Sequence, residues 1–522
     1  MELHIDFYII MKSRIHTMTP LINLKRNFFF LERLNFIPNM KTIQRPNSLT
    51  VRRSIGTLAP TKAAQKNPGT VKTRTLDDMQ NMDEAVVQDE HLMDDEEMVE
   101  LDDLDLEFNE RAEDEEDLDE FDMLTKVTDT SALLARKGQD IQGIPWDRLN
   151  ISRFEYRSTR LEQYKNFENF PLAGEAVKEQ CKRVCKDGNY FEFFHNSRTV
   201  KPTILHFQLR NLIWATSKHD VYLMSNYSLM HWSSISARLT EILNFSGNVA
   251  PNEKHVGNIP EGFTRTQIST LAVKDKIMVL GGFQGELICK RLNNHGVSFC
   301  SRTSYEDNAI SNAIEMYDTF SNGMHFMASS NDGGIREYDI ERFQMLNHFR
   351  FPWAVNHTSV SPDSKLSIVV GDDLDGMLID SRSGKTISPV SGHVDYSFAS
   401  AWHPNGLNFA TGNQDKTSRV WDIRNLSSSV ATLKGNIGAI RSLRFSADGQ
   451  FMVAAEAADF VHIYNTKTNY DEEQEIDFFG EISGVSLSPD DRSIYIGIWD
   501  RTYASMLQYN RRHPYHYLDS YY

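Results

Sequence analysis

The chain has 522 residues, of which 40% are hydrophobic, and its formal net charge is −17. This length and apolar content are sufficient for a large buried core. The charge is unevenly divided: residues 1–75 carry 13 basic and 3 acidic residues, and residues 76–122 carry 24 acidic residues and one arginine. The remaining 400 residues carry 41 basic and 45 acidic residues. The part expected to fold is therefore nearly neutral, and the charge is concentrated near the N-terminus.

Two further features exclude whole classes of protein. Four cysteines (Cys181, Cys185, Cys289 and Cys300) are too few for a disulfide framework in so long a chain. We therefore expect a reducing, intracellular location, in the cytoplasm or the nucleus. Because no second Cys or His pair follows Cys181 and Cys185 at a zinc spacing, we predict no metal site. The chain has no stretch of 18 apolar residues, so we predict no membrane span.

The first 130 residues are expected to be disordered. Residues 1–75 are basic and poor in acids, which fits an organelle transit peptide, but Glu2, Asp6 and the run 28–32 fit such a signal poorly. An upstream extension is the alternative, and organelle targeting is not favoured. Residues 76–130 are too acidic to bury a core. This arm is either a solubilising spacer or a tail that attracts basic partners such as histones.

Residues 131–189 are expected to form a linker and one amphipathic helix. Ser152 and Glu155 have the spacing of a capping box, which predicts a helix that begins at this point. The helix would align four side chains on one face: Tyr156, Arg160, Tyr164 and Phe167. Basic and aromatic residues alternate here, but there is no nucleic-acid-binding motif and the neighbouring arm is anionic, so no direct contact with nucleic acid is expected. The candidate partner-docking residues of the segment are Trp146, Tyr156, Arg160 and Tyr164, with packing against the rest of the fold as the alternative.

The second half of the chain repeats itself. Turn signals of the type Ser-Pro-Asp or Pro-Asn-Gly are centred on Pro362, Pro404, Ala447 and Pro489, at steps of 42, 43 and 42 residues. Short alternating segments precede and follow each turn. A period of 40–45 residues is typical of the four-stranded blade of a β-propeller.

Aspartates mark the same repeat independently. Asp373, Asp415 and Asp500 each follow their turn signal by eleven residues, and Ala458 takes this position in the remaining copy. Asp332 occupies it in an upstream copy that lacks one residue. We predict that the aspartates lie in the turns between two strands of each blade.

Weaker copies upstream bring the predicted number of blades to seven, with six or eight also open. The copies are roughly 203–232, 267–292, 309–339, 354–380, 397–422, 438–465 and 482–510. The spacing between the first two leaves about 22 extra residues within 235–264, interpreted either as a binding loop or as a surface excursion. Ring closure needs an outer strand for the last blade, and the Phe-rich segment 190–200 is the candidate.

The copy at 391–422 resembles the WD40-repeat family. It contains Gly392-His393, Thr411, Asp415 and Trp421-Asp422, and the other copies depart from this pattern. The resemblance implies a buried, structural hydrogen-bond chain that links His393, Asp415, Thr411 and Trp421. The other blades are expected to rest on apolar packing alone. The expected fold is thus all-β: a seven-bladed WD40 β-propeller over residues 190–522, behind a disordered arm and a short helical segment.

A second resemblance covers about residues 130–522. The acidic N-terminal region, the Ile144-Pro145-Trp146 motif and the Tyr-rich C-terminus around Tyr517 resemble a little-characterised family of plant and fungal WD-repeat proteins. This resemblance implies an architecture and no activity.

The sequence favours a function in binding rather than in catalysis. It contains no Gly-x-Ser-x-Gly, His-Glu-x-x-His or Gly-x-Gly-x-x-Gly motif, and no cofactor is expected. Together with the family resemblance, this predicts a scaffold for other proteins. One alternative is a substrate receptor of a cullin-based ubiquitin ligase, because the stretch through Asp422 and Arg424 resembles the box by which many WD proteins dock on the ligase's adaptor. The other alternative is histone or chromatin binding through the acidic arm.

Overall fold

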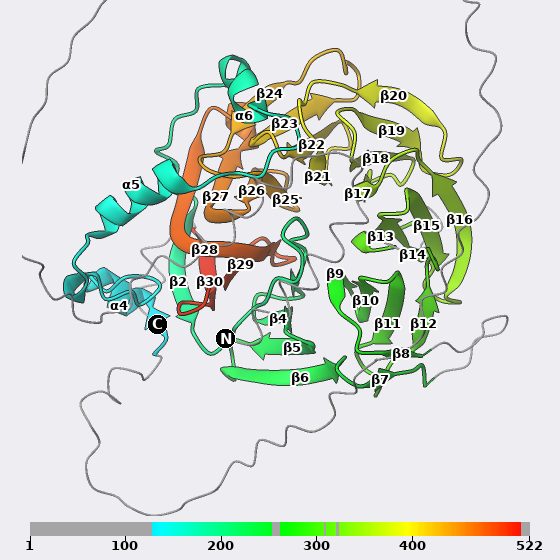
Figure 1. Cartoon of the computed structure of the whole chain (residues 1–522), viewed down its shortest axis with the longest axis horizontal. Coiled ribbons are helices and arrows are strands. Elements are labelled where there is room, and N and C mark those ends of the chain that lie inside the picture. Colours follow the sequence, from blue (N-terminus) through cyan, green and yellow to red (C-terminus); the bar gives the residue numbers. More distant parts are fainter. Residues whose placement is uncertain (1–127, 253–261, 307–308, 320–322, 513–522) are drawn as a thin grey trace, which may run out of the picture. The chain divides into compact units, whose positions relative to one another are not determined.

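The computed structural model describes residues 128–252, 262–306, 309–319 and 323–512. They belong to one compact unit, which spans Glu120–Tyr522. The predictions for residues 1–75 and for most of the acidic arm lie outside the described residues. Within this unit, four-stranded antiparallel sheets follow one another around a ring (Figure 1).

The first four blades each contain four strands in chain order. Blade 1 consists of β3 (Ile213–Ala215), β4 (Asp220–Ser225), β5 (Ser228–Ser233) and β6 (Arg238–Asn244). Blade 2 consists of β9 (Ile268–Lys274), β10 (Ile277–Gly282), β11 (Glu286–Arg291) and β12 (Phe299–Arg302). Blade 3 consists of β13 (Ser311–Asp318), β14 (Met324–Ser330), β15 (Gly334–Asp339) and β16 (Gln344–Arg350). Blade 4 consists of β17 (Val355–Val360), β18 (Leu366–Gly371), β19 (Gly376–Asp380) and β20 (Thr386–Val390).

The last three blades complete the ring. Blade 5 consists of β21 (Ser397–Trp402), β22 (Asn408–Asn413), β23 (Thr417–Asp422) and β24 (Ala431–Lys434). Blade 6 consists of β25 (Ile440–Phe445), β26 (Phe451–Glu456), β27 (Ala458–Asn465) and the first part of β28 (Glu473–Leu487). Blade 7 consists of the second part of β28, β29 (Ser493–Trp499), β30 (Ser505–Arg511) and β2 (Phe191–Ser197). The prediction of a propeller with seven blades is confirmed.

Blade 7 joins the two ends of the ring. β2 pairs antiparallel with β30, with Phe191 opposite Arg511 and Ser197 opposite Met506. The predicted closing strand at 190–200 is therefore confirmed. A short strand, β1 (Thr130–Ser131), adds to the outer edge of β2. The innermost strands of successive blades contact one another all the way around, and the second part of β28 contacts β3 of blade 1.

The strands are apolar on both faces because each blade lies between two others. All six residues of β17, β21 and β26 are buried. The blades therefore pack through clusters of side chains between neighbouring sheets, such as the cluster that joins Phe451, Ile476, Ile494 and Leu507 of blades 6 and 7. Burial of such area is the main stabilising contribution to the fold. The short turns between first and second strands use left-handed glycines, with φ of +68° at both Gly406 and Gly449.

Two details of the predicted first blade are wrong. Residues 207–210 were expected to form a strand, but the first strand of blade 1, β3, begins at Ile213. The side chain of Arg210 points into the fold, where it pairs with Glu481 of blade 7. The expected excursion at 235–264 is partly regular, since it contains β6 and the hairpin of β7 (Asn248–Val249) and β8 (Phe263–Thr264).

The segment before the ring consists of short helices that pack on it. These are α4 (Ala132–Arg136), the 3-10 helix η2 (Trp146–Arg148), α5 (Arg153–Gln163), α6 (Ala173–Ala176) and the 3-10 helix η3 (Lys178–Gln180). A further 3-10 helix, η4 (Thr466–Thr468), lies within blade 6. We call residues 140–182 the strap. In Figure 1 the strap runs from α5 to α6 along blades 5 to 7.

Antiparallel topology gives the ring two faces. The turns between second and third strands and the connections between blades lie at one end of the strands, and the turns between first and second and between third and fourth strands lie at the other. The strap bonds to residues of the first kind, including Asp395, Gln414 and Ala439. We call this end of the ring the strap face and the other end the opposite face.

Candidate functional site

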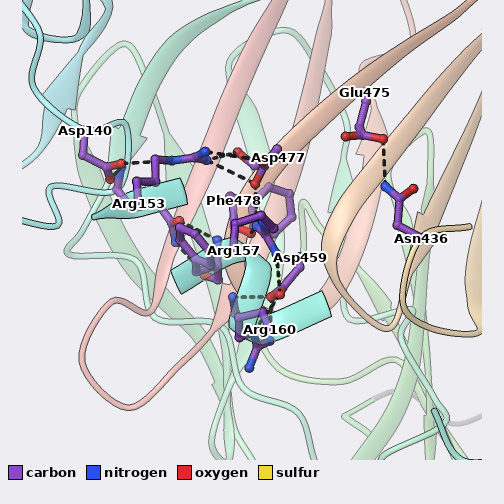
Figure 2. Close-up of polar contacts among 12 residues, drawn as sticks. Asp140, Arg153, Arg157, Arg160, Asn436, Asp459, Glu475, Asp477 and Phe478 are labelled. Atoms are coloured by element: carbon purple, nitrogen blue, oxygen red, sulfur yellow. Dashed lines mark hydrogen bonds and ion pairs between the residues drawn. The ribbon is translucent and has the colours of Figure 1, made fainter. Parts of the chain in front are cut away.

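Helix α5 is fixed to blades 6 and 7 by ion pairs. Ser152 and Glu155 form both bonds of a capping box, as predicted, and start the helix. Arg157 Nη1 lies 2.8 Å from Asp459 Oδ2, and Arg160 Nη2 lies 2.7 Å from Asp459 Oδ1 (Figure 2). The Asp459 side chain is 0% exposed and also accepts a bond from the backbone N–H of Gly480. One buried carboxylate thus binds two arginines of the helix.

Asp477 of β28 extends the same network. Arg157 also bonds Asp477, and Arg153 Nη2 lies 3.1 Å from Asp477 Oδ1. Arg157 stacks over the rings of Phe460 and Phe479, at 4.4 and 4.2 Å from their centroids. Burial opposes the charge of Arg160, but the adjacent Asp459 carboxylate more than offsets burial and raises the pKa of Arg160. The arrangement holds charge firmly and leaves no ionised group of the helix's inner face in need of an external partner.

The predicted docking residues of the strap lie against the ring. Trp146 and Tyr156 pack on each other and on Phe479, with ring centroids 4.9–5.7 Å apart. Tyr164 packs against a buried cluster of Ile437, Ala458 and Phe460. Their contacts, like that of Arg160 with Asp459, lie within the chain, so the packing alternative describes these four side chains. Phe167 lies beyond the helix, which ends at Gln163 and not on the predicted face.

The four polar residues of blade 5 meet as a hydrogen-bond chain. His393 Nδ1 lies 3.0 Å from Asp415 Oδ2, and His393 Nε2 lies 2.8 Å from Thr411 Oγ1. The indole N–H of Trp421 donates to Thr411 Oγ1 at 2.9 Å. Burial opposes ionisation of Asp415, but His393 and bonds from Thr417 lower its pKa. The chain joins the entry loop, the second strand, the turn and the third strand of one blade.

The other three aspartates of the repeat lie in the corresponding turns. Asp332 follows β14 and holds Arg336 at 2.6 Å. Asp373 follows β18 and accepts from the N–H of Asp375, and Asp500 follows β29 and accepts from the N–H groups of Thr502 and Tyr503. Each carboxylate closes its turn by accepting main-chain bonds or a side-chain ion pair.

Blade 6 contains a buried charged network that no motif in the sequence predicts. His462 Nε2 lies 2.8 Å from Glu456 Oε1, and His462 Nδ1 lies 2.6 Å from Glu473 Oε1. Burial alone would lower the pKa of His462, but the bonds to these two carboxylates raise it to about 10. Glu456 also accepts from the backbone N–H groups of Asn436, Ile437 and Gly438. The expectation that this blade rests on apolar packing alone is wrong, because the glutamates replace the missing turn aspartate.

Glu475, next to this network, connects it to the surface. It accepts from Asn436 Nδ2 at 2.7 Å (Figure 2) and from Lys186 Nζ. His462, Glu473 and Glu475 bring possible metal-ligand atoms within 4.8 Å of one another. Both ring nitrogens of His462 already bond carboxylates, and Lys186 balances Glu475, so we interpret the group as an ion network.

The remaining candidate residues lie on the opposite face. Asp422 ends β23, and Arg424 Nη2 lies 2.6 Å from Asp422 Oδ2. The Arg424 side chain is 69% exposed, so this turn is accessible. The four cysteines are free, and Cys181 and Cys185 lie after η3 and not on a common helix. Among the described residues, no helix is long and apolar enough to cross a membrane.

The geometry defines a seven-bladed β-propeller with one complete Asp-His-Thr-Trp chain. The family model described as "WD domain, G-beta repeat" matches residues 384–422 and 427–465, which include β21 to β23 and β25 to β27. The protein is therefore a WD40-repeat protein.

Individual relatives are similar over different lengths. An uncharacterised protein of Schizosaccharomyces pombe is 25% identical over 322 residues, which are 56% of this chain and 84% of that protein. Pre-mRNA-processing factor 19 homolog 2 of Arabidopsis thaliana is 30% identical over 116 residues, or 22% of each chain. A chain in a crystal structure of the mitotic checkpoint complex is 14% identical with a TM-score of 0.49, over 63% of this chain and 93% of that chain.

Proposed function

We propose that the protein is a non-enzymatic scaffold that binds other proteins. The observation that carries the proposal is the unequal use of the ring's two faces. The strap covers residues of the strap face in blades 5 to 7, whereas the exposed turn at Asp422 and Arg424 lies on the opposite face. Exposed turns carried on a rigid ring are suited to contacts with several proteins at once.

The fate of the buried ionisable groups supports this proposal. Asp415 and His393, Asp459 and Arg157, and His462 and its two glutamates pair within the fold. Catalytic groups usually converge on an open concave site, whereas these pairs tie strands and the strap together. Such pairing is what a scaffold needs to keep its shape.

The proposal is tested by cross-linking the tagged full chain in cells and identifying the cross-linked peptides by mass spectrometry. We expect stable partner proteins, with cross-links that favour lysines of the opposite face, such as Lys365 and Lys467. A purified chain that recovers no protein partner and turns over a metabolite would refute the scaffold.

A more specific candidate is a substrate receptor of a cullin-based ubiquitin ligase. The exposed Arg424 side chain, held by Asp422 at the end of β23, favours it. The variant Arg424→Ala should lose binding to the ligase adaptor in a co-precipitation of the full chain. Lys467→Ala is the matched control, because Lys467 lies in the same turn of the next blade. Adaptor binding that survives Arg424→Ala, or is absent from the native chain, contradicts this candidate.

A further inference from the structure

A polar groove lies between the end of the strap and the outer edge of blade 5. Its accessible volume is about 460 Å³, and its lining includes two cations, Lys182 of the strap and Arg419 of β23. Five hydroxyl side chains also line it: Ser391, Ser427, Ser428, Ser429 and Thr432. None of the described residues that line the groove is acidic. Guanidinium, ammonium and hydroxyl groups together form a donor set suited to an oxyanion.

Arg419 is the anchor of this donor set. Its side chain is buried, with 4% of the residue exposed, and its Nη2 donates to Gln180 Oε1 at 2.7 Å. Its Nε is buried without a hydrogen-bond acceptor in the described part of the chain, and no carboxylate there lies within ion-pair distance of it. A buried guanidinium with an unused N–H is costly unless an acceptor satisfies it. Burial lowers the pKa of Arg419, and the nearest carboxylate, Asp415, is committed to His393.

Gly392 leaves room for the guanidinium. A Cβ at this position would lie 3.1 Å from Arg419 Nη1 and 3.1 Å from Trp421 Cη2. The Gly-His pair at the entry to blade 5 thus serves two purposes: His393 completes the hydrogen-bond chain, and Gly392 admits the arginine to the groove.

The other donors lie toward the surface. Lys182 Nζ lies 2.7 Å from Asp471 Oδ1 and donates to the backbone carbonyl of Asn469 at 2.6 Å, so one of its three N–H groups is left for a ligand. The hydroxyl groups of Ser429 and Thr432 lie 3.0 Å apart and bond each other, and Ser427 bonds Asn425. Hydroxyl hydrogens rotate, so these groups can redirect a donor toward an anion.

We propose that this groove binds a phosphoserine or phosphothreonine side chain of a partner protein, with Arg419 as the buried donor. A phosphoryl group carries about −1.5 to −2 charges and three strong acceptor oxygens, which match one guanidinium, one ammonium and several hydroxyls. The proposal rests on the scaffold function and deepens it, because it makes binding at blade 5 depend on modification of the partner. The groove is built only when the strap is docked, since Gln180 and Lys182 belong to the strap.

The test uses fluorescence polarisation of the full chain with two labelled degenerate peptide pools, one centred on phosphoserine and one on serine. We expect at least about tenfold tighter binding of the phosphoserine pool, as charge-assisted hydrogen bonds to a charged group provide. Arg419→Met, which keeps an unbranched apolar side chain, should lose this preference. Lys182→Ala should weaken it about threefold to tenfold, as loss of an exposed charge contact does. Lys365→Ala, an exposed lysine of blade 4, is the control and should change nothing.

Each other outcome overturns the proposal. Equal binding of the two pools does so, as does a phosphoserine preference that persists in both Arg419→Met and Lys182→Ala. If Arg419→Met fails to fold, as judged by its thermal unfolding, Lys182→Ala decides alone. Inorganic phosphate that raises the melting temperature while neither pool binds would assign the groove to free phosphate only. Partners that still cross-link to the native chain in that case leave the scaffold function standing, so the two failures are distinguishable.

Discussion

Arg157 of α5 binds Asp459, a residue 302 positions later in the chain, with Nη1 and Oδ2 2.8 Å apart. Asp459 adopts a left-handed φ of +71° directly after Ala458, where the repeat of the other blades has its aspartate. The carboxylate of blade 6 has thus moved by one residue, and it faces the strap instead of its own turn. Attachment of the strap depends on this displaced carboxylate.

Asp459→Asn tests that dependence. The change leaves Arg157 and Arg160 buried without their main counter-charge, and removal of one partner from a buried ion pair costs about 3–5 kcal/mol. We expect a lower melting temperature and faster proteolytic cleavage between α5 and α6. Asp490→Asn, whose carboxylate is part-exposed in a turn of blade 7, is the matched control. Unchanged proteolysis of Asp459→Asn would show that the ion pairs do not hold the strap.

The hydrogen-bond chain of blade 5 should behave as one unit. Thr411→Val removes the oxygen that joins His393 Nε2 to the Trp421 indole, and an unsatisfied buried donor costs about 1–3 kcal/mol. Trp421→Phe removes the indole N–H. Because both changes break the same bond, the double variant should lose less free energy of unfolding than the two single losses added together. Thr386→Val, on the exposed outer strand of blade 4, serves as the control, and strict additivity would contradict a connected chain.

The network around His462 predicts loss of stability at alkaline pH. The folded-state pKa of His462 is raised to about 10 from an ordinary value of 6.5. A raised pKa means that the folded protein holds a proton that the unfolded chain releases, so the contribution is complete below about pH 6.5 and declines as pH rises toward 10. The melting temperature should therefore fall between pH 7 and 10 more steeply in the native chain than in His462→Gln. Parallel pH profiles would show that His462 is neutral in the fold.

Close approach of the chain just after the strap to β28 predicts a steric effect at Gly188. A Cβ there would lie 2.6 Å from the backbone oxygen of Glu473, to which the Gly188 N–H already donates at 2.9 Å. Gly188→Ala must push this segment away from blade 6, and we expect a loss of about 1–3 kcal/mol in the free energy of unfolding. Gly247→Ala is the control, because nothing lies within 4 Å of the position that a Cβ would take there. Equal stability of the two variants would mean that the segment is free to shift.

The repeat made much of the fold predictable. The turn signals and the aspartate frame indicated the number of blades, and the need for an outer strand pointed to residues 190–200, which pair with β30. The alternation of polar and apolar residues helped less, because strands such as β17 and β21 are buried on both faces. Blade 1 was misplaced at its start, where Arg210 turns inward and no turn signal marks the register.

The strap and its contacts could not be predicted from the sequence in the same way. An amphipathic helix is normally buried by its apolar side, but α5 buries Arg157 and leaves Phe154 80% exposed. That inversion depends on Asp459 and Asp477, which lie about 300 residues away and carry no local signal. His462 was missed for a similar reason, because its two glutamates come from other strands of blade 6.

Closure of the ring by β2 also constrains how the chain is made. The strand that completes blade 7 is synthesised before any blade, and its partner β30 emerges last, more than 300 residues later. During translation β2 must therefore wait with unpaired backbone groups, a state that invites pairing with other chains. The final step of folding brings together two distant segments and bears the entropic cost of the largest loop in the protein. A ribosome that stalls before residue 505 would release six blades and an open seam.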